Sequence, residues 1–111
     1  MGAVEALLEV LRWYLARRGD IVVPTARAAG QERVKVAFRG LYRSLPDTLG
    51  YARFTDIVDE ILSDPGERAR LEGLGVRVVE VGGEPYLEVP LDLLERLWGE
   101  VQRGGGRGAY L

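Results

Sequence analysis

Residues 71–89, LEGLGVRVVEVGGEPYLEV, determine the architecture that the sequence predicts. Leu71 and Leu74 continue an apolar stripe at helical spacing. Either Gly73 or Gly75 can adopt the left-handed backbone conformation that ends a helix. The stretch therefore begins as the last turn of a helix and stops at a glycine.

The remainder of this stretch predicts a β-hairpin. Residues 76–81 are rich in β-branched side chains, and residues 86–89 alternate in polarity, so each segment favours a strand. The intervening residues 82–85, GGEP, form a turn, because paired glycines adopt positive φ freely and proline cannot donate to a ladder. Since a two-stranded hairpin is marginal alone, it must pack against helices.

The pattern L-x-x-L-G-V at residues 71–76, running into a hairpin, resembles the helix-to-wing junction of winged helix-turn-helix DNA-binding domains. The resemblance implies an α+β, winged-helix-like fold: mostly helical, with a short strand, a β-hairpin and a C-terminal helix. In that layout the short strand lies between the first and second helices and pairs with the hairpin. The resemblance also implies binding to double-stranded DNA.

Length and composition predict one domain over residues 1–103, followed by a flexible glycine-rich tail at residues 104–111. No apolar run is long enough to cross a bilayer, and Glu5 and Glu9 argue against a basic signal-peptide start. We therefore expect a cytoplasmic protein. The small number of thermolabile side chains suits a thermophile, although a GC-rich genome would also explain why arginine replaces nearly all lysine.

The chain of 111 residues contains no cysteine and no histidine. This composition excludes disulfides, zinc sites built on thiolate or imidazole, and Ser-His or Cys-His nucleophile pairs. We therefore predict a protein that is not an enzyme and that has no cofactor. An acidic group could be interpreted as a magnesium site, but solvation of a helix face is the commoner reason for such residues; its members are Asp56, Asp59, Glu60 and Asp64.

Charge is distributed unevenly along the chain. Residues 1–53 hold nine basic and five acidic residues, a net charge of +4, whereas residues 54–111 hold six basic and twelve acidic residues, a net charge of −6. One interpretation is a nucleic-acid face in the first half. The other is complementarity between two halves that pack together.

The first half predicts a helix over Ala3–Arg18 that ends at Gly19. Ile21-Val22-Val23 predicts the short strand of the winged-helix layout, closed by Pro24. The wide apolar surface of the first helix fits either a central core helix or a homodimer interface. The interface residues predicted from the first and last helices are Trp13, Tyr14 and Trp98.

A helix over Gln31–Leu45 is the strongest functional signal in the sequence. Its apolar residues recur at helical spacing from Val34 to Leu45, although the alternation of Val34, Val36 and Phe38 would also fit a strand. The preceding PTARAAG adds a helix–turn–helix cadence. Basic side chains on this helix and beside it are predicted to contact DNA phosphates or a groove; they are Arg27, Arg33, Lys35, Arg39, Arg43 and Arg53.

Three further helices complete the prediction. They are expected within Leu49–Ser63, over Pro65–Gly73 and over Leu91–Gln102. Asp64 is an expected N-cap, with proline at the first helical position and glutamate three residues after the cap.

Together these features favour a small DNA-binding protein, a dimeric transcriptional regulator. The hairpin does not fit a simple DNA-tracking wing, because Glu80, Glu84 and Glu88 surround Arg77 and would be repelled by phosphates. The alternative is therefore a protein-interaction module or an accessory subunit of a nucleic-acid-processing complex, with a protein partner at the acidic hairpin.

Overall fold

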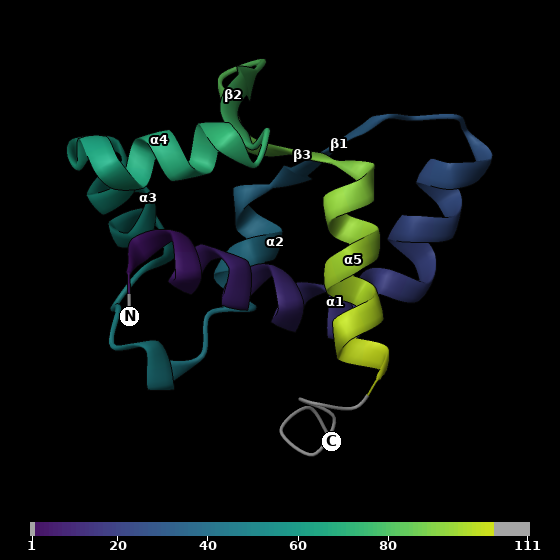
Figure 1. Ribbon diagram of the computed structural model, residues 1–111, viewed down its shortest axis with the longest axis horizontal. Coiled ribbons are helices and arrows are strands. Elements are labelled where there is room, and N and C mark those ends of the chain that lie inside the picture. The colour runs from purple at the N-terminus through teal and green to yellow at the C-terminus, as the bar shows by residue number, and fades with distance from the viewer. Residues whose placement is uncertain (1, 104–111) are drawn as a thin grey trace.

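The computed structural model describes residues 2–103, which form helices packed on one face of a small antiparallel sheet (Figure 1). The elements in chain order are α1 (Ala3–Ala28), β1 (Arg33–Ala37), α2 (Phe38–Tyr42), a 3-10 turn (Asp47–Leu49), α3 (Phe54–Ser63), α4 (Pro65–Gly73), β2 (Arg77–Val81), β3 (Glu84–Pro90) and α5 (Leu91–Gln102). The predicted α+β class, with a hairpin and a C-terminal helix, is confirmed, and the arrangement is compatible with a winged helix. The predicted tail at residues 104–111 lies outside the described residues.

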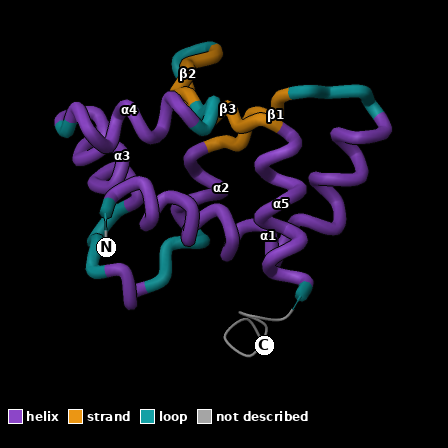
Figure 2. Tube along the Cα trace, viewed as in Figure 1, coloured by secondary structure: helices purple, strands orange, loops and turns teal. Residues whose placement is uncertain are grey.

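The sheet has the order β1-β3-β2 and is antiparallel throughout. Gly82 and Gly83 form the two-residue turn between β2 and β3, with φ of 59° and 82°. This left-handed pair matches the right-handed twist of the flanking strands. The hairpin turn projects away from the helices (Figure 2).

Pro85 belongs to the strand β3, not to the turn. It stands opposite Glu80 of β2, and the pairing of β1 with β3 begins only at Tyr86. The proline is therefore tolerated in the central strand because it precedes the part that has a neighbour on both sides.

The helix α1 runs well beyond the predicted end at Gly19. Residues 21–23, predicted to be a strand, continue the helix, which also contains Pro24. That strand prediction is wrong, and so is the predicted stop. Proline has no N–H to give to the carbonyl four residues earlier, and α1 changes direction along its length (Figure 1).

The helix predicted over Gln31–Leu45 is wrong in its first part, because residues 33–37 form β1 and only residues 38–42 form the helix α2. The helix–turn–helix cadence at PTARAAG fails with it, since this segment belongs largely to α1. The strand nevertheless lies between the first and second helices and pairs with the hairpin. The predicted topology is thus met by residues 33–37 in place of residues 21–23.

The junction between α4 and β2 follows the prediction. Gly75 has a φ of 78°, its N–H donates to the carbonyl of Glu72 at 2.9 Å, and the N–H of Val76 donates to Leu71 at 3.3 Å. This pair of bonds is a Schellman motif, and the buried Leu71 and Val76 supply its hydrophobic contact. Gly75, not Gly73, therefore ends the helix.

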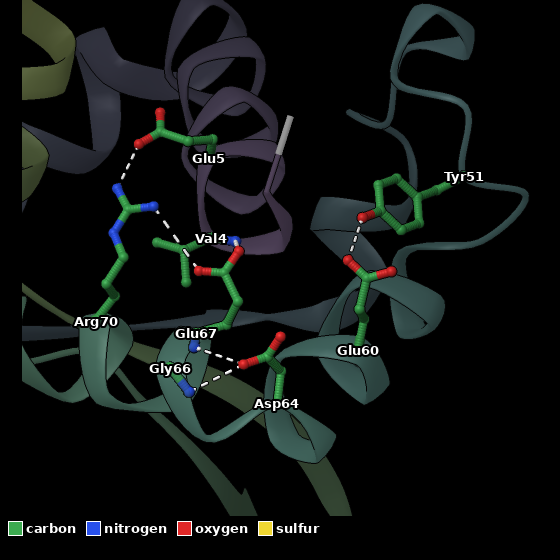
Figure 3. Close-up of polar contacts among 8 residues, drawn as sticks. All are labelled: Val4, Glu5, Tyr51, Glu60, Asp64, Gly66, Glu67 and Arg70. Carbon is green, nitrogen blue, oxygen red and sulfur yellow. Dashed lines mark hydrogen bonds and ion pairs between the residues drawn. The ribbon is translucent and has the colours of Figure 1, made fainter.

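The N-terminus of α4 also follows the prediction. The Asp64 carboxylate accepts from the backbone N–H groups of Gly66 at 2.9 Å and Glu67 at 3.2 Å (Figure 3). Arg70 of the same helix pairs with Glu5, and Glu67 accepts from the N–H of Val4, so α4 is fastened to the start of α1.

The core is one cluster of buried side chains from the helices and the sheet, and α5 and α3 pack on α1. Its largest side chains with almost no exposed surface include Leu7, Leu11, Leu15, Leu41, Phe54, Ile57, Leu87 and Leu94. Gly19 is buried where α5 packs on α1, and a Cβ on Gly19 would lie 2.4 Å from Cδ1 of Trp98. No helix among residues 2–103 is long and apolar enough to cross a bilayer.

Candidate functional site

Five of the six basic residues that the sequence assigned to DNA have a carboxylate partner within the chain. Arg27 pairs with Glu95, and its Nε donates at 3.0 Å. Arg39 lies 3.7 Å from Glu84, and Arg53 lies 3.3 Å from Asp56. Within residues 2–103, Arg43 is the one member of the set without an ion pair.

Glu88 neutralises part of the solvent-facing surface of the sheet. The strand register places it directly between Lys35 of β1 and Arg77 of β2. Arg77 donates to Glu88, while Lys35 and Arg33 lie at 3.7 and 3.5 Å. These cations hold the pKa of the Glu88 carboxyl below its usual range, with the Arg77 hydrogen bond as the largest cause. The carboxylate therefore remains charged at neutral pH.

Much of the charge asymmetry is used to join the two halves of the chain. Arg27, Arg33, Lys35 and Arg39 pair with carboxylates of β3 or α5, and Arg12 joins Glu100 at 3.0 Å. Exposed pairs of this kind contribute about 0–1 kcal/mol each. These pairs matter more for function than for stability, because they neutralise several of the cations that were predicted to contact phosphates.

Four arginines line a pocket of about 470 Å³ between α1, β1 and α2, and two of them belong to the predicted set. We call it the arginine pocket, and its lining residues are Tyr14, Arg17, Arg18, Val36, Ala37, Arg39, Gly40 and Arg43. Four of these eight residues are arginines, and none is acidic. Arg39 is the one cation of the lining that is paired with a carboxylate of the described residues, and its side chain is still 75% exposed.

Local contacts hold the arginine pocket together. Nη1 of Arg17 donates to the backbone carbonyl of Arg43 at 3.3 Å, which ties α1 to the end of α2. Gly40 faces the Tyr14 ring, since a Cβ on Gly40 would lie 3.6 Å from Cε1 of the tyrosine. Burial raises the pKa of the Tyr14 hydroxyl, although Arg18 and Arg17 oppose that shift. The pocket thus combines guanidinium groups with a half-buried aromatic ring.

Sequence reasoning missed Arg17 and Arg18 as functional residues. Both stand near the end predicted for the first helix, where basic residues suit the helix dipole. In the structure this position is the middle of α1, so the dipole does not account for them. Their proximity to Arg39 and Arg43 depends on how α1 packs against α2, which no local pattern reveals.

Three of the four acidic residues considered as a magnesium site have other roles. Glu60 accepts a hydrogen bond of 2.7 Å from the Tyr51 hydroxyl, which raises the pKa of Tyr51 to about 12, and Asp64 caps α4 (Figure 3). Asp56 accepts from the backbone N–H of Arg53 at 3.2 Å at the start of α3. No acidic group within residues 2–103 is arranged to hold a metal ion.

The predicted dimer residues lie on α1 and α5. Trp98 packs against Gly19, where α5 meets α1, and Tyr14 lines the arginine pocket. Trp13 is partly buried. The homodimer stays a prediction.

Comparison with known proteins gives no match: no family model matches the chain, and neither a curated protein nor a solved structure matches it significantly.

Proposed function

We propose that this chain is a small non-enzymatic nucleic-acid-binding protein, and that the arginine pocket contacts phosphate groups. The observation that carries the proposal is the meeting of Arg17, Arg18, Arg39 and Arg43 in a lining without any carboxylate. Arginine binds phosphate oxygens bidentately and releases condensed counterions as it does so. The absence of histidine and cysteine from the sequence supports a binding role over a catalytic one.

The proposal retains two residues of the original set, Arg39 and Arg43, and adds Arg17 and Arg18. Arg27, Arg33 and Lys35 are better explained by their ion pairs with Glu95 and Glu88. Double-stranded DNA stays a candidate ligand, and a dimeric transcriptional regulator is the role that such binding would fit.

A protein-interaction module or accessory subunit is the second candidate. The observation that favours it is the hairpin, where Val78, Val81, Glu80 and Glu84 are exposed near the turn. A surface of this kind suits a protein partner better than a phosphate backbone. A measurement of nucleic-acid binding distinguishes the two candidate functions, because only the first requires it.

The test measures binding of labelled single-stranded and duplex oligonucleotides at several salt concentrations. The four arginines predict a slope of log K against log salt of about −3.6 for duplex DNA and about −2.8 for a single strand. Removing two of them in Arg18→Gln/Arg43→Gln should weaken binding at 0.1 M salt by about 60-fold for duplex or about 25-fold for a single strand.

The matched control is Arg68→Gln/Arg96→Gln, which removes the same charge from exposed positions outside the arginine pocket. This variant should bind as the wild type does. Equal losses of affinity in both variants would mean that net charge alone attracts the nucleic acid. If the wild type does not bind at low salt, the nucleic-acid proposal fails and the protein-interaction module becomes the favoured function.

A further inference from the structure

The shape of the arginine pocket restricts what it can hold. Residues of α1, β1 and α2 surround a hollow of about 470 Å³, which lies within the range of about 300–1,000 Å³ typical of small-molecule sites. A duplex is read by an element that protrudes into a groove, such as a helix. Here both helices at the pocket, α1 and the five-residue α2, form its wall together with β1. A hollow of this size fits a single nucleotide unit better than a duplex.

The charge of the arginine pocket exceeds what one internal phosphate of a strand would need. A bridging phosphodiester carries one negative charge, whereas a phosphate monoester carries about −1.5 to −2 at neutral pH and has three strong acceptor oxygens. Arg17, Arg18 and Arg43 have no carboxylate partner within residues 2–103, and Arg39 is held only loosely, at 3.7 Å from Glu84. A doubly charged terminal phosphate matches this concentration of guanidinium groups.

Two further features fit a nucleoside attached to that phosphate. The Tyr14 ring lies in the lining together with Val36 and Ala37, which gives the pocket an apolar and aromatic part beside its cations. Aromatic side chains stack on any base. Glu84, which lies beside the hairpin turn and 3.7 Å from Arg39, would repel a phosphate backbone that ran past it.

We infer that the arginine pocket takes a nucleoside phosphate monoester, with the phosphate on Arg17, Arg18, Arg39 and Arg43 and the nucleoside beside Tyr14. This inference rests on the proposed function and narrows its ligand from nucleic acid in general to the terminal phosphate. Two sources share this chemistry: the phosphorylated end of a strand and a free nucleoside monophosphate.

The test uses the full chain and three single-stranded 12-mers of one sequence, carrying a 5′-phosphate, a 3′-phosphate or no terminal phosphate, each labelled away from the phosphate. At least one phosphorylated strand should bind tenfold or more tightly than the unphosphorylated strand. Arg18→Gln/Arg43→Gln should lose this discrimination, and Arg68→Gln/Arg96→Gln should keep it.

Competition then separates the two sources. Displacement by adenosine monophosphate at the same concentration as the phosphorylated strand would assign the site to free nucleotides, and a requirement for tenfold more would assign it to strand ends. Displacement by inorganic phosphate should need far higher concentrations, because it lacks the nucleoside.

The inference and the proposed function fail in different ways. Binding that depends on the arginine pocket but is equal for all three strands would overturn the inference and leave the proposed function. No binding of any strand or duplex at low salt, together with no binding of adenosine monophosphate, would overturn both.

Discussion

Phe54→Ala is expected to lower the free energy of unfolding by about 3–5 kcal/mol. Phe54 is 1% exposed, and its ring meets Phe38 edge-to-face with centroids 5.0 Å apart and Tyr42 at 6.1 Å. The residue begins α3, so its ring joins that helix to α2. The change leaves a cavity and removes two aromatic contacts, which is why the loss exceeds that of an aliphatic truncation.

Urea denaturation measures this loss, and Leu62→Ala in the same helix provides the matched control. Leu62 is 46% exposed, so its truncation removes little buried surface and should cost less than about 1 kcal/mol. A cost below about 1 kcal/mol for Phe54→Ala would contradict the described packing of α2 on α3.

Gly19→Ala is the second large expected effect, with a loss of about 1–3 kcal/mol from overpacking. Alanine normally stabilises a helix interior relative to glycine. At Gly19, however, the new methyl group would lie 2.4 and 2.5 Å from Cδ1 and Nε1 of Trp98. The indole cannot turn away cheaply, because Trp98 packs against the core.

Gly73→Ala in α4 is the control, since a Cβ there meets nothing within 4 Å. It should raise the free energy of unfolding by about 0.5–1 kcal/mol. Thermal or urea unfolding of the two variants should therefore differ by about 1.5–4 kcal/mol. Equal stabilisation by both would mean that α5 does not pack closely on α1 at this position.

The parts of the fold that the sequence predicted well are those whose signals are local. The Asp64 cap, the Gly75 helix end, the glycine turn and the helix Leu91–Gln102 each depend on residues within a few positions of one another. These local signals are sufficient to predict the α+β class.

The predictions for residues 19–23 were wrong because tertiary contacts, and not local preferences, determine the structure of this segment. Ile21, Val22 and Val23 are β-branched residues, which favour a strand. They continue α1 instead, because extending a formed helix is easier than starting a new element and because Val23 is fully buried in the core. Glycine at position 19 signals a helix stop, yet here it serves the close approach of Trp98.

For residues 33–37 two periodicities overlapped. The helical period extends further along the chain and favours a helix, although Val34 and Val36 also alternate as in a strand. The decision comes from β3, whose buried Leu87 and Val89 pair with Val36 and Val34. A single sequence does not reveal that partner, which lies some fifty residues away.

Tertiary contacts also explain why the candidate site in the structure differs from the set of residues that the sequence predicted. The sequence identifies which residues are cationic, but it does not say which cations are paired. Cross-strand and interhelical carboxylates partner Arg27, Arg33 and Lys35, while packing of α1 on α2 brings Arg17 and Arg18 to Arg39 and Arg43.

The central claim is that phosphates bind at the arginine pocket, and the most direct test follows the arginine side chains themselves. The measurement is an NMR titration of the arginine Nε–Hε signals with a short 5′-phosphorylated oligonucleotide at low salt. We predict shifts at Arg17, Arg18, Arg39 and Arg43, with Arg27 and Arg53 unchanged. Shifts at Arg27 and Arg53 with the pocket arginines unchanged, or no shift at any arginine, would contradict the account.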